Sequence, residues 1–230
     1  MSKKELAHRV VDHYVNSEDS IRTTAKKFDV KRGFVEYHVE KQDAYKTKFK
    51  HSLNEGFFDE IDTEEKAYWL GFLFADGYVS DFTKNPTYNI EIGLKGSDIG
   101  HLYKFKEAIE YTGEPKERIQ TVNGKDYETC RLCLACKHMV LSLNEQGCTP
   151  KKTLDIQYPD LPKTLNKHFI RGYFDGDGSI TIYKNQGNDK LSISIGSGSK
   201  EFLQDIQGII IEELELTKTK IYKDKRSELR

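Results

Sequence analysis

The chain has 230 residues, of which 37% are hydrophobic and 32% charged, and its formal net charge is −1. This length leaves room for one duplicated domain and a small additional one, and the composition is typical of a soluble globular protein. No apolar run approaches the roughly 20 residues of a membrane-spanning helix, and the N-terminus lacks the apolar stretch of a secretory signal, so we expect a cytosolic protein without membrane contact.

Residues 1–45 predict a small all-α domain. Apolar residues recur at helical spacing over residues 3–16, Ser20 can cap a second helix, and a short turn leads into a third helix over 31–41. Two helices joined by a tight turn, with basic residues on the second, are typical of a helix-turn-helix domain. Residues 1–50 carry a net charge of +4. If the domain binds DNA, the candidate contacts are Lys31, Arg32 and Tyr37; the alternative is a plain three-helix cap.

Residues 46–61 are polar and predict a linker, and residues 62–147 predict a unit of order αββαββα. Its elements are a helix opened by Thr63, strands at 78–83 and 87–95, a helix from Ser97 to about 111, strands at 117–122 and 127–134, and a helix over 137–145.

Residues 148–166 contain three of the five prolines and predict a second linker, after which the order restarts at 167–230. Strands are expected at 179–184 and 190–195, a helix after Ser199, and the start of a third strand at 219–223. The fourth strand and closing helix have no counterpart, so the second unit is expected to be incomplete at its C-terminus.

The two units share a repeated motif at residues 68–77 (YWLGFLFADG) and 169–178 (FIRGYFDGDG), 101 positions apart. Such a repeat predicts two copies of one structural unit. Each copy reads as an apolar helix that ends at a glycine. Small residues four positions apart share one helix face and let two helix backbones approach closely. We therefore expect the helices to pair about a pseudo-two-fold axis through Gly71, Ala75, Gly172 and Gly176.

This pairing would bring Asp76 and Asp177 together at one end of the helices. A carboxylate in the last turn of a helix meets the negative end of the helix dipole, and two nearby carboxylates raise the pKa of one another. A sequence selected only for stability would not carry an Asp at the end of the helix in both copies of the motif. Mg²⁺ is usually held by one or two carboxylates plus phosphate oxygens, which would turn this arrangement into a binding site.

At these residues the chain resembles the LAGLIDADG homing endonucleases in their single-chain, two-motif form. The second motif fits fully; the first has Phe74 where the family pattern has its first Asp. The resemblance implies an α+β fold, a duplicated αββαββα unit with pseudo-two-fold symmetry, here preceded by the small all-α domain. It also implies a monomeric endonuclease that cuts both strands of duplex DNA with Mg²⁺ or Mn²⁺. The implied metal ligands are Asp76, Asp177, Gly77 and Gly178. The candidate basic residue near the scissile phosphate is Lys152 or its neighbour Lys151.

Each predicted sheet has an apolar face, which we expect the helices to cover, and a polar face. β-Ribbons with a polar face fit the major groove of DNA. A solvated sheet face is the alternative interpretation. The candidate DNA contacts are Asn89, Glu91, Lys95, Arg131, Thr181, Tyr183, Ser192 and Ser194.

Two other functions remain open from the sequence. A DNA-binding regulator on a nuclease-derived scaffold would be expected to lose the acids, which are retained. An RNA maturase that assists intron splicing has no distinguishing mark here. We expect the protein to act in the cytoplasm of a prokaryote, on the nucleoid and encoded by the cell or by a phage, or in an organelle.

Overall fold

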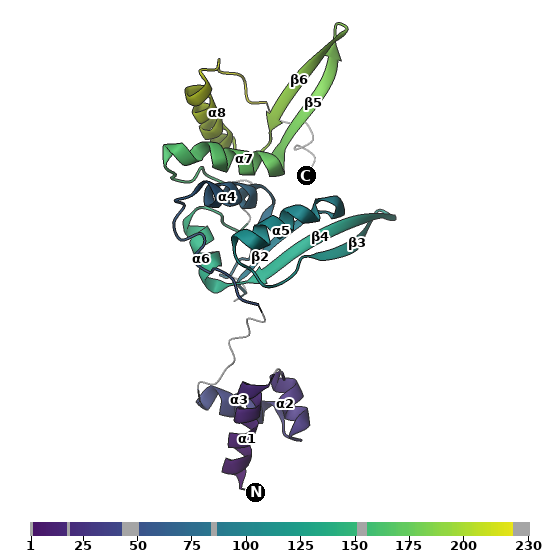
Figure 1. Cartoon of the computed structure of the whole chain (residues 1–230), viewed down its shortest axis with the longest axis vertical. Coiled ribbons are helices and arrows are strands. Elements are labelled where there is room, and N and C mark those ends of the chain that lie inside the picture. The colour runs from purple at the N-terminus through teal and green to yellow at the C-terminus, as the bar shows by residue number, and fades with distance from the viewer. Residues whose placement is uncertain (1, 18, 43–50, 84–86, 151–155, 223–230) are drawn as a thin grey trace. The chain divides into compact units, whose positions relative to one another are not determined.

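The computed structural model describes residues 2–17, 19–42, 51–83, 87–150 and 156–222 (Figure 1). The chain divides into two compact units, residues 1–50 and residues 51–230. None of the helices within the described ranges is long and apolar enough to cross a bilayer.

The first unit consists of α1 (Lys3–Asn16), α2 (Ile21–Lys27) and α3 (Arg32–Lys41). Ser2 and Ser20 cap α1 and α2, since their hydroxyl groups accept hydrogen bonds from the backbone N–H groups of Glu5 and Thr23. The three helices enclose a core of their own, made of Val10, Val11, Tyr14, Ala25, Val35 and Val39.

The second unit is α+β, as predicted, and its first part has the expected order αββαββα (Figure 1). The elements are α4 (Glu64–Asp76), β1 (Gly77–Val79), β2 (Asn89–Lys95), α5 (Ile99–Ala108), β3 (Lys116–Val122), β4 (Lys125–Ala135) and α6 (Lys137–Glu145). The four strands form an antiparallel sheet of order β1-β2-β4-β3. Strand β1 ends at Val79, earlier than the predicted end at residue 83, and residues 84–86 between the two predicted strands lie outside the described residues.

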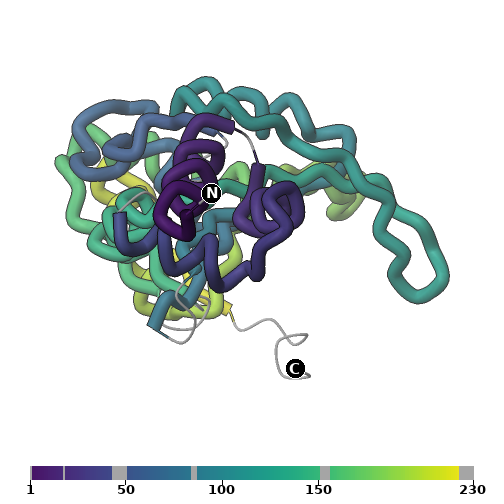
Figure 2. Tube along the Cα trace, turned by 90° about the horizontal axis from the view of Figure 1, so that it is seen from below, coloured from purple at the N-terminus to yellow at the C-terminus, as the bar shows by residue number. Residues whose placement is uncertain are grey.

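This sheet buries one face. Along β2 and β4, Ile90, Ile92, Leu132 and Leu134 are at most 2% exposed, whereas their neighbours in sequence are exposed or half-buried. The register pairs Ile90 with Leu134 and Ile92 with Leu132, so the apolar side chains lie opposite each other on the same face. Beyond the end of β2, β3 and β4 continue as a hairpin that projects from the body of the unit (Figure 2).

The second part contains α7 (Asn166–Asp177), β5 (Gly178–Asn185), β6 (Asn188–Ile195) and α8 (Lys200–Leu214). This is the order of the first four elements of the preceding part, with a sheet of two strands. The third strand that the sequence predicts at 219–223 is not observed, because residues 216–222 have no regular secondary structure and residue 223 lies outside the described ranges. Instead, Gln207 on α8 donates a hydrogen bond to the Thr219 carbonyl over 3.0 Å.

The prediction that helices cover one face of each sheet is wrong for the β5–β6 hairpin. Ile180 pairs with Ile193 at the position where Val79 pairs with Ile90 in the first sheet. Val79 and Ile90 are each 1% exposed, but Ile180 and Ile193 are 62% and 63% exposed. In the first part β4 and α6 complete the layers around this pair. The described residues of the second part supply no equivalent strand or helix.

This difference predicts unequal effects of the same substitution at equivalent positions. Ile90→Ala should lower the free energy of unfolding by about 2–5 kcal/mol, because it leaves a cavity in a packed core. Ile193→Ala should change it by no more than about 0.5 kcal/mol, because its side chain is already in water. Urea denaturation of both variants tests this, and an equal loss of stability would contradict the exposure of the hairpin.

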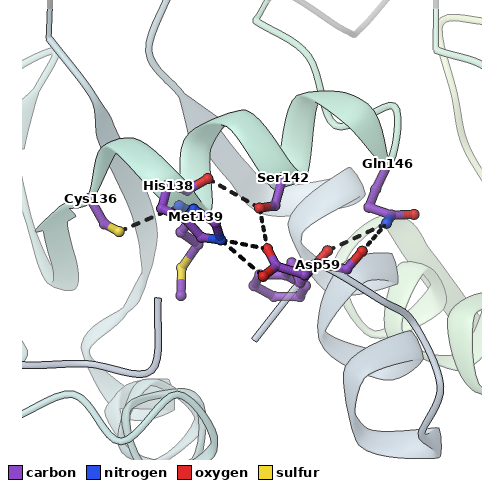
Figure 3. A network of polar contacts seen from close by, with 7 residues as sticks. Asp59, Cys136, His138, Met139, Ser142 and Gln146 are labelled. Carbon is purple, nitrogen blue, oxygen red and sulfur yellow. Dashed lines mark hydrogen bonds and ion pairs between the residues drawn. The ribbon is translucent and has the colours of Figure 1, made fainter. Parts of the chain in front are cut away.

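Residues 51–61 belong to the second unit, so the prediction of a linker over 46–61 fails for this part. Phe57, Phe58 and Ile61 are buried in the core of the second unit. Asp59 holds the segment against α6 (Figure 3), since its carboxylate accepts hydrogen bonds from Ser142 Oγ at 2.6 Å and His138 Nε2 at 2.8 Å. The hydrogen bond from Ser142, followed by that from His138, lowers the pKa of Asp59. The hydrogen bond to Asp59 raises the pKa of His138.

The Asp59–His138 pair predicts a pH-dependent stability. Its His138 contribution is fully present below the ordinary histidine pKa of 6.5 and is lost as the pH rises through the raised folded-state pKa. The Asp59 contribution is lost only as the pH falls through its lowered pKa, well below this window. Urea denaturation should therefore show a larger destabilisation by His138→Gln at pH 5.5 than at pH 8.5. Ser142→Ala, which removes a neutral donor to the same carboxylate, should destabilise equally at both values.

Candidate functional site

The site is built where α4 and α7 cross in direct backbone contact. A Cβ on Gly71 would lie 2.0 Å from the Phe169 carbonyl oxygen, and a Cβ on Gly172 would lie 1.9 Å from the Tyr68 carbonyl oxygen. Both distances are far below van der Waals contact, so neither position admits a side chain. Since Gly172 and Phe169 are the counterparts of Gly71 and Tyr68 in the repeat, the two contacts are equivalent. The two helices are thus fixed relative to each other by their backbones.

The crossing places the last residues of the two helices beside each other. Asp76 ends α4 and Asp177 ends α7, and both line a single pocket of about 440 Å³. A Cβ on Gly176 would lie 2.4 Å from Ala75 Cβ and 3.1 Å from Asp76 Oδ2, so Asp76 lies directly against α7. The two acids that the sequence singles out therefore come from different repeats into one pocket.

The pocket is electronegative, because two carboxylates and the C-terminal ends of two helices lie at it. The last turns of α4 and α7 contain no basic residue, so each carboxylate meets the negative end of its own helix dipole. Tyr173 lines the same pocket and donates a hydrogen bond from its hydroxyl group to the Gly196 carbonyl over 3.0 Å. Burial raises the pKa of Tyr173, and the charges of Asp177 and Asp76 add to this effect. The arrangement suits a cation.

Gly77 and Gly178 end the two helices, and both positions require glycine because of a close approach to the preceding helical turn. Their φ angles are −78° and −88°, so neither closes its helix in the left-handed conformation. A Cβ on Gly77 would instead lie 2.6 Å from the Leu73 carbonyl oxygen, and one on Gly178 would lie 2.3 Å from the Phe174 carbonyl oxygen. Glycine here lets the chain pass from a helix directly into a strand without a clash.

An asymmetric contact joins the helices beside the pocket. In the first motif Phe74 is buried and its ring lies 5.1 Å from that of Phe169. Its counterpart Asp175 accepts a hydrogen bond of 2.7 Å from the hydroxyl group of Tyr68, the counterpart of Phe169. Burial, and then Asp175, raise the pKa of Tyr68, which keeps its hydroxyl proton available for this bond. The sequence offered no signal for Tyr68, because its partner is 107 positions away.

A broad groove of about 1520 Å³ runs from the C-terminal end of α4 along the open face of the first sheet. It is lined by Asp76 and Asp175 at one end and by Glu91, Lys95 and Arg131 along β2 and β4. Of these predicted DNA contacts, Arg131 and Glu91 form an ion pair with each other. Asn89 begins β2 on the same side as Glu91 and is half-buried.

Four further polar residues on this face are not among the DNA contacts predicted from the sequence. The register pairs Lys116 with Arg131 and Gln120 with Tyr127, which places them beside the predicted contacts. Three of them lie on β3, where all seven residues are exposed, so no buried face indicates which residues share a side. The fourth lies in the exposed first part of β4. The four residues are Lys116, Arg118, Gln120 and Tyr127.

The remaining predicted residues lie in three places. Thr181 pairs with Ser192 on the polar face of the β5–β6 hairpin, and Tyr183 and Ser194 share this face; all four are exposed. Lys31, Arg32 and Tyr37 are exposed on the first unit. Lys152 lies outside the described residues.

Comparison with known proteins identifies related sequences. The model of the LAGLIDADG-like domain family matches residues 164–229. An intron-encoded DNA endonuclease, ai2b, of Dictyostelium discoideum is 24% identical over 168 residues, which cover 66% of this chain and 60% of that protein. The homing endonuclease I-WcaI, solved bound to its DNA recognition sequence, is 14% identical with a TM-score of 0.48, covering 70% of this chain and 69% of that one.

Two longer proteins of Methanocaldococcus jannaschii also match. A probable translation initiation factor IF-2 is 37% identical over 164 residues, which cover 70% of this chain. A replication factor C small subunit is 27% identical over 155 residues, which cover 65% of this chain. The matches span only 12% and 7% of these two proteins.

Proposed function

Because this chain belongs to the LAGLIDADG homing-endonuclease family, we propose that it hydrolyses one phosphodiester bond in each strand of duplex DNA at a specific site. The observation that carries the proposal is that Asp76 and Asp177, at the ends of two helices in backbone contact, line one pocket. Since one chain supplies both acids, we expect a monomer to cut both strands.

The acids are suited to hold divalent cations. Mg²⁺ favours oxygen ligands and is usually bound by one or two carboxylates plus phosphate oxygens of the substrate. Two carboxylates beside the buried hydroxyl group of Tyr173 meet this requirement. We propose Asp76 and Asp177 as ligands of Mg²⁺ or Mn²⁺, with the neighbouring carbonyl groups of Gly77 and Gly178. When bound, such a metal would lower the pKa of a water molecule and stabilise charge on the phosphate oxygens.

The chain's own residues would hold the substrate in place. The open face of the first sheet adjoins Asp76 through the groove, and its basic residues Lys95, Lys116 and Arg118 can neutralise phosphates. Gln120 and the Arg131–Glu91 pair can contact base edges in the major groove, as can Thr129, which pairs with Arg118 in the sheet and lines the same groove. The polar face of the β5–β6 hairpin, with Thr181 and Ser192, would contact the other half of the site. Lys152 is retained as a proposed basic residue near the scissile phosphate.

The test is cleavage of a randomised duplex-DNA library by the full chain with Mg²⁺ or Mn²⁺, followed by sequencing of the new ends. The proposal expects paired cuts on the two strands at a fixed spacing within one preferred sequence, and no cuts in EDTA. Cuts in one strand only, or an absence of cleavage with either metal, would overturn it.

A further inference from the structure

The first unit has a fold of its own, independent of the acids. Its core residues Val10, Val11, Tyr14 and Val39 are at most 4% exposed. Among the described residues, their hydrophobic cluster consists of side chains from α1, α2, α3 and the turn between α2 and α3. A unit that packs its own core can carry a separate function.

A tight turn joins α2 to α3, which is the connection expected in a helix-turn-helix. Four residues, 28–31, separate Lys27 at the end of α2 from Arg32 at the start of α3. Asp29 in this turn adopts φ +51°, and the backbone N–H of Val30 donates to the Ala25 carbonyl over 3.0 Å. These contacts end α2 sharply after seven residues and redirect the chain into α3. In such folds the second helix of the pair can lie in the major groove of DNA.

The segment formed by α2, the turn and α3 carries a net positive charge. Val35 and Val39 turn one side of α3 into the core, which leaves the other side open to solvent. Residues 21–41 contain six Lys or Arg and three Asp or Glu, a net charge of +3. We define the basic surface as the exposed residues Arg22, Lys26, Lys31, Arg32, Tyr37 and Lys41.

Two details of the basic surface fit a close approach by DNA. Among the described residues, no side chain or other segment comes within 4 Å of the place where a Cβ on Gly33 would stand, so the backbone of α3 is open there. Tyr37 is 57% exposed and Lys41 Nζ lies 5.8 Å from the centre of its ring, so the ring can pack against a sugar while its hydroxyl group donates to a phosphate. Arg32 is partly neutralised, because its guanidinium lies 2.7 Å from the carboxylate of Glu36.

We propose that the basic surface is a second DNA-binding site, on which α3 enters the major groove of duplex DNA while Lys31 and Arg32 contact phosphates. The inference deepens the proposed endonuclease function, because it would lengthen the DNA sequence that the enzyme reads. It does not depend on cleavage, since none of its residues belongs to the metal pocket.

The experiment measures binding of the full chain to a generic DNA duplex in EDTA, as a function of salt. Each phosphate contact contributes about 0.9 to the slope of log K against log salt concentration. The double variant Lys31→Gln/Arg32→Gln should lower the magnitude of this slope by about 1–2 and weaken binding about tenfold at 0.1 M salt. The control Lys3→Gln/Lys4→Gln on α1 removes the same charge from the same unit and should change affinity less than twofold.

A third variant separates DNA contact from damage to the fold. Glu36→Gln frees the Arg32 guanidinium and should strengthen DNA binding several-fold. Equal effects of the two double variants, or weaker binding by Glu36→Gln, would overturn the proposal. Because no cleavage is measured, failure of the endonuclease proposal would leave these differences unchanged, and Asp76→Asn/Asp177→Asn should retain them in full.

Discussion

Asp76→Asn and Asp177→Asn are each expected to reduce double-strand cleavage by at least about 100-fold, because each removes a charged ligand from the proposed metal site. Asn keeps the size of the side chain and one of its oxygens, so the helix contact beside Gly176 should persist. If each acid serves chiefly one strand, the single variants should leave a nicked product. Gel analysis of a supercoiled plasmid that carries the selected site distinguishes nicked from linear DNA.

The same variants should become more stable as they lose activity. Each carboxylate opposes the dipole of its own helix, and its removal should raise the free energy of unfolding without metal by about 0.3–1 kcal/mol. Glu145→Gln is the matched control, because Glu145 is the exposed last residue of α6 and its charge opposes that helix dipole in the same way. This control should gain similar stability and cut DNA normally. An Asp76→Asn variant that cuts at the wild-type rate would remove Asp76 from the mechanism.

Gly172→Ala is expected to lower the free energy of unfolding by at least about 3 kcal/mol, at or above the upper end of the range for overpacked cores. The new methyl group would overlap the Tyr68 carbonyl oxygen, 1.9 Å away, and a backbone atom within a helix cannot move aside as a side chain can. Separating the helices would also separate Asp76 from Asp177, so cleavage should be lost. Because the contacts are equivalent, Gly71→Ala should have a similar effect. Urea denaturation and far-UV circular dichroism measure the loss.

Gly208→Ala provides the control for the general effect of replacing a helical glycine. Gly208 lies in α8 with no atom within 4 Å of its absent Cβ, so the substitution should stabilise the protein by about 0.5–1 kcal/mol through helix propensity. Opposite signs at the two glycines would support backbone contact as the cause. If Gly172→Ala were within about 1 kcal/mol of the wild type, the close crossing of α4 and α7 would be wrong.

The pattern of the chain was sufficient to predict most of the scaffold. The spacing of apolar residues and the capping residues predict helices, and every helix of the second unit begins within about three residues of its predicted start. The repeat at a spacing of 101 residues was enough to single out Gly71, Gly172, Asp76 and Asp177, because the same backbone requirements recur in both copies. Helix signals and internal repeats can therefore be identified from the sequence alone.

Tertiary structure decided the features that depend on a distant partner. Phe57 and Phe58 lie in a polar stretch that predicts a linker, yet they pack into the core of the second unit. The neighbouring Asp59 is bound by residues of α6 some 80 positions further on, a contact that the sequence does not indicate. The open face of β3 could be assigned only from its register with β4. Ile180 and Ile193 alternate like core residues but stand in water, since burial depends on a covering layer and not on the residue itself. Apolar periodicity determines which side of a helix or strand is hydrophobic. Only the packing of the whole chain determines whether another strand or helix covers that side.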